Sequence, residues 1–404
     1  MNILFVNDIP FNPIGGGLER VTDIITKELV KRGYVVFYLY GKLLPSQTYL
    51  LDYEFPALLY QLPNYDLFDN AENVHFYKQL QRDLKIDVVI NQRGLGGWFN
   101  SMLSITQTKL VSVIHSRPDG DIIVFLNNLL ELTAPPYIVI KRFIKRIFLI
   151  VVASYWKKKA MLELREKYNE LTRYSDVIVA LSKKDIDIYK KIIDVTHQTR
   201  LVAIPNPNTF TLNELSIEAK KKCVLYVGRL NKAEKEPIRL LKVWKMLNKT
   251  HKDWCLKFVG DGNEKNKMQE YVKSHGLRNV VFVGRQTDVA SYYNEASFVC
   301  LTSNYEGWGM ALTEGMQYGC VPFTFNNYGA AFEIIDDGLN GCLIPAFNLK
   351  KYASRLSELM QDENKRKKMS KAAMIKVKKF SVENVVNQWE DLFQSLVYNK
   401  HVAN

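Results

Sequence analysis

The strongest chemical signal in the sequence is a pair of glutamates around a glycine-rich stretch. Glu306 and Glu314 are separated by seven residues and follow an apolar run at 298–301 that predicts a β-strand. A helix is predicted to begin after the glycines, and the free backbone amides of its first turn can bind an anion. The residues expected to supply these amides are Gly309, Met310 and Ala311. Carboxylates on each side of the anion can accept hydrogen bonds from sugar hydroxyls. An acidic helix cap beside a solvated glutamate is the alternative.

A second candidate group follows a strand predicted at 223–227. Gly228 permits close approach of a ligand at the end of this strand, and Arg229 and Lys235 follow six residues apart. Two cations at the carboxyl end of a strand can hold a diphosphate, arginine as a fork and lysine as a point charge. They would also stabilise the charge that develops on a departing diphosphate. Ordinary surface charge is the alternative.

Near the N-terminus, Gly15, Gly16 and Gly17 end a loop and open a helix, which also suits a phosphate. A nicotinamide site is disfavoured, because the gap after the first strand is too long and Arg20 stands at the place of the third glycine. No G-x-x-x-x-G-K-[ST] motif occurs, which excludes a P-loop. A glycine loop without a ligand is the alternative.

Length and composition limit the class of protein. The 404 residues predict two domains, or three, and 55 Lys+Arg against 42 Asp+Glu give a net charge of +13. The five cysteines include no C-x-x-C pair, so we expect reduced thiols in a cytoplasmic protein rather than disulfides or a zinc site. The sequence predicts neither a signal peptide nor a transmembrane helix.

Alternating strands and helices along both halves are typical of parallel sheets. Strands are expected at 1–6, 34–40, 87–91, 110–115 and 177–181, and again at 223–227, 256–259, 280–283, 298–301 and 321–325. The expected fold class is α/β, with two doubly wound domains that face a central cleft. Ligands of such sheets bind beyond the carboxyl ends of the strands.

Together these motifs resemble the retaining glycosyltransferases of family 4, which have the GT-B fold of two Rossmann-like domains. Four motifs agree in order and spacing: the glycine loop ending at Gly17, V-G-R-L…K from Val227, V-G-D-G at Val259–Gly262, and S-x-x-E-G-x-G…E from Ser303. The resemblance implies an acceptor-binding domain at 1–205 and a nucleotide-sugar-binding domain at 206–380. It also implies a last helix at 381–404 that crosses back to the first domain, with Trp389 as a packing anchor.

The resemblance assigns roles to single residues. Arg229 and Lys235 would bind the donor diphosphate and help the nucleotide leave, Glu306 would contact the transferred sugar, and Glu314 would hold the ribose hydroxyls. His115 would lie near the reacting sugar carbon, although a histidine at a strand end is more often a packed residue. The other donor-binding residues would be Gly16, Gly17, Gly228 and Arg285, the last in the turn that holds the base.

The sequence departs mildly from the family pattern. Gly315 stands where alanine is usual, Phe323 replaces a common valine, and residues 325–333 follow the pattern loosely. Asp119-Gly-Asp121 and Asp185-Ile-Asp187 have the D-x-D form that binds a divalent cation in the other large glycosyltransferase fold. We expect no metal and no cofactor, because Arg229 and Lys235 supply the positive charge.

A basic amphipathic helix is predicted between residues 136 and 159, where seven cations and no acid occur. On a helical wheel, cations of its first turns occupy about 0–140° and apolar side chains about 180–340°. Such a helix can lie on an anionic membrane, whereas packing of its apolar face into the core is the alternative. Nucleic acid is the rival partner of a basic protein, but no recognition motif supports it. The residues expected to contact the membrane are Lys141, Arg142, Lys145 and Arg146.

The sequence therefore predicts a retaining glycosyltransferase that moves a sugar from a nucleotide diphosphate to a glycan hydroxyl. A UDP-sugar is favoured on family frequency alone. Membrane proximity suggests a lipid-linked acceptor in bacterial capsule, exopolysaccharide or lipopolysaccharide synthesis, at the inner face of the cell membrane. A nucleotide-sugar epimerase of the same fold and a non-catalytic membrane-associated scaffold are the alternatives.

Overall fold

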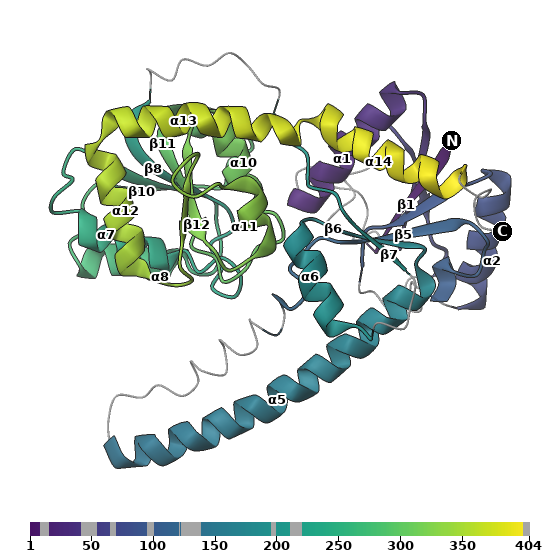
Figure 1. Cartoon of the computed structure of the whole chain (residues 1–404), viewed down its shortest axis with the longest axis horizontal. Helices are drawn as coiled ribbons and strands as arrows, with labels where there is room; N and C mark the ends of the chain where they lie inside the picture. The colour runs from purple at the N-terminus through teal and green to yellow at the C-terminus, as the bar shows by residue number, and fades with distance from the viewer. Residues whose placement is uncertain are drawn as a thin grey trace. The chain divides into compact units, whose positions relative to one another are not determined.

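The chain forms two compact units (Figure 1). A computed structural model describes residues 1–8, 16–41, 55–64, 70–94, 101–120, 122, 139–194, 199–210 and 220–398, with the backbone alone at 139–153. The first unit comprises residues 1–118, 159–209 and 380–404, and the second comprises 119–158 and 210–379.

The expected domain boundary at residues 205 and 206 stays a prediction. The helix α5 (Val139–Tyr174) is longer than the sequence predicts. Its buried residues in the described part are Leu164, Tyr168, Leu171 and Thr172, so only its C-terminal part packs in the first unit.

The first unit is built on a parallel sheet whose strand order is β3-β2-β1-β4-β5-β6-β7. Its strands are β1 (Asn2–Asn7), β2 (Val35–Tyr40), β3 (Leu58–Gln61), β4 (Val88–Asn91), β5 (Lys109–Ile114), β6 (Val177–Ala180) and β7 (Arg200–Ala203). The central strands are continuous apolar runs with almost no exposed surface, as expected where helices cover both faces of a parallel sheet. The chain reverses its direction of winding between β1 and β4, which makes their carboxyl ends the switch point where ligands bind in such folds.

Besides α5, the helices of this unit are α1 (Gly17–Lys31), α2 (Ala71–Asp83), α6 (Lys183–Ile192) and α14 (Val382–Val397). Three of them begin at residues whose side chains accept a backbone N–H of the first turn, namely Asn70, Ser182 and Ser381. Such caps satisfy amides that a helix leaves without an internal partner.

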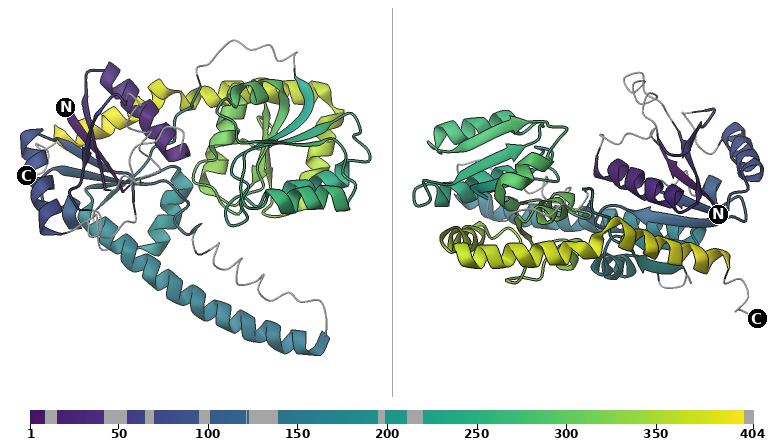
Figure 2. Two further views of the ribbon diagram at one scale, coloured as in Figure 1. Left: turned by 180° about the vertical axis from the view of Figure 1, so that it is seen from behind. Right: turned by 90° about the horizontal axis from the view of Figure 1, so that it is seen from above.

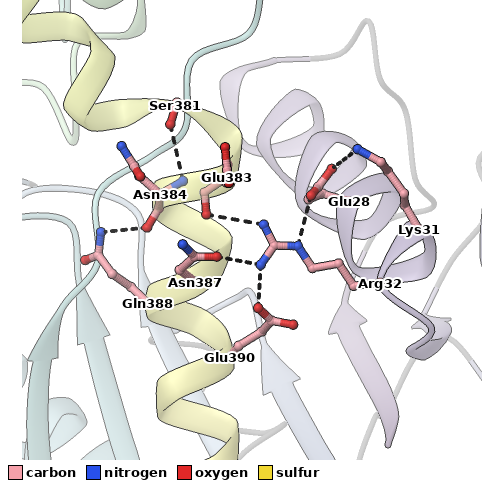
Figure 3. A network of polar contacts seen from close by, with 9 residues as sticks. All are labelled: Glu28, Lys31, Arg32, Ser381, Glu383, Asn384, Asn387, Gln388 and Glu390. Carbon is pink, nitrogen blue, oxygen red and sulfur yellow. Dashed lines mark hydrogen bonds and ion pairs between the residues drawn. The ribbon is translucent and has the colours of Figure 1, made fainter.

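The C-terminal helix α14 lies beside α1 in the first unit, and Arg32 joins them (Figure 3). The guanidinium donates to Glu28 Oε1 at 2.9 Å within its own helical segment, to Asn387 Oδ1 at 2.6 Å, and to the Glu390 carboxylate. On the apolar side, the Trp389 ring packs 5.7 Å from that of Phe393, which lies 6.4 Å from Tyr34. The last helix is thus held to the N-terminal unit by both charge and ring packing.

The second unit contains a parallel sheet of order β10-β9-β8-β11-β12-β13. Its strands are β8 (Lys221–Val227), β9 (Cys255–Val259), β10 (Val280–Gly284), β11 (Ala296–Cys300), β12 (Val321–Phe325) and β13 (Cys342–Ile344). Its helices are α7 (Ile238–Leu247), α8 (Lys265–Ser274), α9 (Ala290–Glu295), α10 (Met310–Gln317), α11 (Gly329–Ile334), α12 (Leu349–Gln361) and α13 (Glu363–Val377). Each sheet has helices on both of its faces (Figure 2). The α/β class with two doubly wound parallel sheets is confirmed, and the switch point of this sheet lies between β8 and β11.

All five cysteines are free thiols in the second unit, and only Cys255 retains appreciable exposure. Across the described residues, none of the helices has the length and apolar character that crossing a bilayer requires.

Candidate functional site

The switch point of the second sheet brings the two strongest sequence motifs together. Arg229 and Lys235 lie on the loop after β8, and Glu306 lies on the loop after β11, the strand paired with β8. Because the carboxyl ends of adjacent parallel strands meet at one edge of the sheet, these loops are neighbours. We call this group of loops the switch-point site.

Lys235 and Glu306 form the central ion pair of the switch-point site. The Lys235 ammonium donates to Glu306 Oε2 at 2.6 Å, and the Ser303 hydroxyl donates to Oε1 at 2.6 Å. The Glu306 side chain is 6% exposed and that of Lys235 is 20% exposed. Two charge-assisted bonds at opposite oxygens fix this carboxylate in one orientation.

The two loops are also tied by their backbones. The Asn304 amide donates to Glu234 O at 2.7 Å, and the Asn304 side chain donates to Lys232 O and Ala233 O at 3.1 and 2.9 Å. Arg239 at the start of α7 donates to Thr302 O at 3.1 Å. The separation of Lys235 and Glu306 is therefore set by several contacts besides their own ion pair.

Arg229 has a different environment. Its guanidinium donates to Glu234 Oε2 at 2.6 Å, and its side chain is 70% exposed. An exposed ion pair of this kind contributes little to stability. A ligand with more negative charge than one carboxylate can therefore draw Arg229 away from Glu234 at small cost.

The V-G-D-G motif supports the loop that carries these cations. Gly228 donates to Val259 O at 3.0 Å, and Leu230 donates to Asp261 O at 2.9 Å. A Cβ atom at Gly260 would lie 1.9 Å from Gly228 O, and Gly260 has a φ of +140°. The motif thus serves close packing of two backbone loops, a role that the sequence did not reveal.

Helix α10 begins at the edge of the switch-point site. Its N-cap is Gly309, at a φ of +90°, and no side chain caps the helix. The first helical residues are Met310 and Ala311, so the structure places the predicted amides at this N-terminus. A positive helix end that follows the Glu306 loop favours a phosphate.

Glu314 lies further along α10 and is 1% exposed. The hydroxyl of Tyr293 donates to Glu314 Oε2 at 2.7 Å. Sequence reasoning found Glu314 but neither Tyr293 nor Ser303 as hydrogen-bonding partners, because they become neighbours of the glutamates only when the elements pack. The following residue, Gly315, leaves no room for alanine, since a Cβ there would lie 2.7 Å from Val299 Cγ1.

Three predicted residues belong to the first unit. Gly16 is the N-cap of α1, which begins at Gly17, and no side chain caps it, whereas Gly15 lies outside the described residues. His115 follows β5, and its Nε2 contacts the side-chain oxygen of Gln92, which follows β4. Burial lowers the pKa of His115 to about 3, so its imidazole is neutral at pH 7.

The remaining predicted residues are not part of the Lys235–Glu306 ion pair, and some of them lie outside the described residues. Arg285 is exposed on the turn after the edge strand β10. The side chains of Lys141, Arg142, Lys145 and Arg146 lie outside the described residues, as does Asp121. Asp185 accepts from the Ser182 hydroxyl in a helix-capping contact at the start of α6. In the described part of the chain, no three His, Cys, Asp or Glu side chains are grouped for a metal ion.

Comparison with known proteins finds a family match over the residues that form the switch-point site. Residues 208–375, which include every switch-point motif, match the family Glycosyl transferases group 1. This match covers less than half of the chain, and it lies almost wholly within the second unit. The assignment to family 4 stays a prediction.

An alpha-1,4-N-acetyl-D-galactosaminyltransferase of Campylobacter jejuni, named for an acceptor on undecaprenyl diphosphate, is 27% identical over 54% of the chain and 59% of its own length. The amylovoran biosynthesis glycosyltransferase AmsD of Erwinia amylovora is 30% identical over 43% of the chain and 48% of its own length. The match thus covers between 48% and 61% of the length of three curated relatives.

Solved structures of the GT-B fold cover more of the chain. The structure of Anabaena HepE with UDP and glucose aligns over 98% of this chain and all of HepE, with a TM-score of 0.70 and 18% identity. At that identity the likeness establishes the GT-B fold and no more.

Proposed function

We propose that the protein is a retaining glycosyltransferase that transfers a sugar from a UDP-sugar to a hydroxyl of a glycan acceptor. The observation that carries the proposal is the switch-point site, where Lys235 pairs with Glu306 on the loop that leads into α10. The group 1 family match over the same residues supports it. UDP is favoured because structural neighbours such as HepE were solved with UDP.

In the proposed reaction, Lys235 and Arg229 bind the diphosphate together with the first amides of α10. The bond between the anomeric carbon and the diphosphate oxygen breaks, and the acceptor oxygen bonds to the same face of the sugar. The acceptor proton passes to the departing phosphate, and the two cations stabilise the charge that develops there. Glu306 accepts hydrogen bonds from hydroxyls of the transferred sugar while it remains paired with Lys235. Cationic side chains make a metal unnecessary in this scheme.

Nucleotide binding tests the donor assignment. The melting temperature of the purified protein is measured with UDP, GDP, ADP and NAD, each in large excess. A ligand at about 100 times its dissociation constant adds about 2.7 kcal/mol to the free energy of unfolding. We expect UDP alone to raise the melting temperature. Stabilisation by NAD alone, or by none of the four, would contradict the proposal.

We further propose that the acceptor is lipid-linked and that α5 docks the protein on the anionic cytoplasmic face of a membrane. All six residues from 154 to 159 are exposed. Among them, Tyr155 is 65% exposed, and Lys158 follows it by three residues on the same side of the helix; Leu162 follows at 50%. An exposed aromatic and aliphatic surface with lysines suits the interface of an anionic bilayer.

The helix geometry connects these residues to the sequence pattern before them. Since α5 is continuous from Val139, each residue advances by about 100°. On the wheel that begins at Lys141, Tyr155 and Leu162 fall at about 320° and 300°, within the apolar sector. Lys157 and Lys159 fall at about 160° and 0°, at the borders of the basic sector, whereas Lys158 and Trp156 depart from the pattern.

Vesicle binding tests the docking proposal. The variant K157E/K158E should partition to phosphatidylglycerol vesicles about thirtyfold or more weakly than wild type, at about 1 kcal/mol per lysine. The matched control K183E/K184E reverses two exposed lysines on α6 and should bind as wild type does. Equal loss in both variants would indicate a non-specific charge effect, and tighter binding of wild type to single-stranded RNA would favour nucleic acid; either result overturns the proposal.

A further inference from the structure

The phenol of Tyr293 holds the carboxylate of Glu314. Glu314 lies on α10 and Tyr293 on α9, and the Tyr293 hydroxyl donates to Glu314 Oε2 at 2.7 Å. Both residues are almost fully buried, at 1% and 0% exposure. A buried carboxylate requires hydrogen-bond donors, and a donor in low-dielectric surroundings restricts its orientation strongly.

The position of the Tyr293 ring is fixed from three sides. Tyr318 stacks on it at a centroid distance of 6.2 Å and an angle of 16°. Phe210 meets its edge, also at 6.2 Å. The backbone carbonyl of Tyr293 accepts from Lys220 Nζ at 2.7 Å and from Cys320 Sγ at 3.1 Å. The phenol therefore loses little further freedom when it holds the carboxylate.

We infer that Tyr293 is a positioning residue for donor recognition: it orients Glu314 so that the carboxylate accepts hydrogen bonds from the ribose hydroxyls of the nucleotide. This inference rests on the proposed function, which assigns Glu314 to the ribose. A carboxylate has about four lone-pair positions, so it can accept from the phenol and also from the hydroxyls of a vicinal diol. Acceptance by two hydroxyls at once requires a fixed carboxylate plane, and the bond from Tyr293 restricts that plane.

A purely structural tyrosine would make the same contact, because buried phenols usually find a partner. The two roles differ in what the loss of the hydroxyl does to ligand discrimination. If Tyr293 only fills space and satisfies Glu314, its hydroxyl affects all nucleotides equally. If it orients Glu314 toward the ribose, its loss weakens a ligand that has both hydroxyls more than a ligand that lacks one.

The experiment compares UDP with 2′-deoxy-UDP by calorimetric titration of wild type, Tyr293→Phe and Tyr318→Phe. We expect wild type to bind UDP about tenfold or more tightly than 2′-deoxy-UDP, because a hydrogen bond to a charged group contributes an energy of that size. Y293F should reduce this preference to about threefold or less and leave the affinity for 2′-deoxy-UDP nearly unchanged. Y318F removes a hydroxyl from the same ring cluster, and it should retain the wild-type preference. The ratio of two affinities measured on one sample does not depend on the fraction of folded protein.

Other outcomes separate the two levels of the argument. If wild type binds UDP and prefers it but Y293F keeps the full preference, or loses affinity for both nucleotides equally, the role of Tyr293 is wrong. If wild type binds neither nucleotide, or binds both equally, the assignment of Glu314 to the ribose is wrong, and the inference falls with it. In a Glu314→Gln background, Y293F should have no further effect on the preference, and an additive effect would also overturn the inference.

Discussion

Alanine in place of Lys235 is expected to lower kcat/KM for sugar transfer by about a hundred- to a thousandfold. The loss of one group that stabilises developing charge has an effect of this size. The ammonium supplies a positive charge at the switch point, 2.6 Å from Glu306 Oε2. Without it, the departing diphosphate meets the negative Glu306 carboxylate with one cation fewer. Arg229 is 70% exposed, and water screens it more than Lys235. Steady-state transfer from UDP-sugar measures the effect.

The stability of this variant must be measured beside its activity. Glu306 is 6% exposed, and a buried carboxylate that loses its partner costs about 3–5 kcal/mol. The matched control is Lys257→Ala on the neighbouring strand β9, which breaks a 3.0 Å ion pair with Glu295 of helix α9. K257A should retain wild-type kcat/KM. Activity of folded K235A within about threefold of wild type would show that Lys235 is not part of the catalytic site.

The strands that the sequence predicted and those it missed differ by position in the sheet. Every central strand of both sheets was predicted to within about two residues, because each is a continuous apolar run buried on both faces. The strands β3, β7 and β13 were not predicted, and all three are edge strands of three or four residues. Leu58 and Leu59 of β3 are exposed although they are apolar. The apolar pattern of this strand therefore does not follow its burial, and the sequence does not identify it.

A similar division holds for the switch-point site. The residue types and spacing identified Lys235 and Glu306, which lie on loops after recognisable strands, and Glu314, which lies in the helix after the second loop. Spacing did not reveal that Lys235 and Glu306 pair directly, nor that Ser303 and Tyr293 hold the two carboxylates. Tyr293 precedes Glu314 by 21 residues and belongs to another helix. Such partners are fixed by tertiary packing, which local patterns do not record.

The helix α5 shows a third kind of difference. The sequence predicted a basic amphipathic helix that ends near Lys159, whereas α5 continues to Tyr174. The added turns bury Leu164, Tyr168 and Leu171 in the first unit. The pattern of charges in the sequence thus described one part of a helix whose other part packs in the core.

Alanine at Gly260 is expected to destabilise the protein by about 3 kcal/mol or more, because backbone strain and a steric clash act together. The φ of Gly260 is +140°, a conformation that L side chains rarely adopt. The added Cβ would lie 1.9 Å from Gly228 O, which is backbone and cannot rotate away. The loop that begins at Gly228 must then move, and Arg229 and Lys235 move with it. Urea unfolding measures the first effect, and UDP affinity of the folded fraction measures the second.

Gly276 provides the matched control for this substitution. It also has a positive φ, +59°, but a Cβ there would meet nothing within 4 Å. Gly276→Ala should therefore cost about 1 kcal/mol, the ordinary penalty of a left-handed residue, and leave UDP affinity unchanged. Equal destabilisation by both substitutions would mean that backbone conformation alone accounts for Gly260. A larger loss in G260A, together with weaker UDP binding, would establish that the V-G-D-G turn supports the diphosphate loop by close packing.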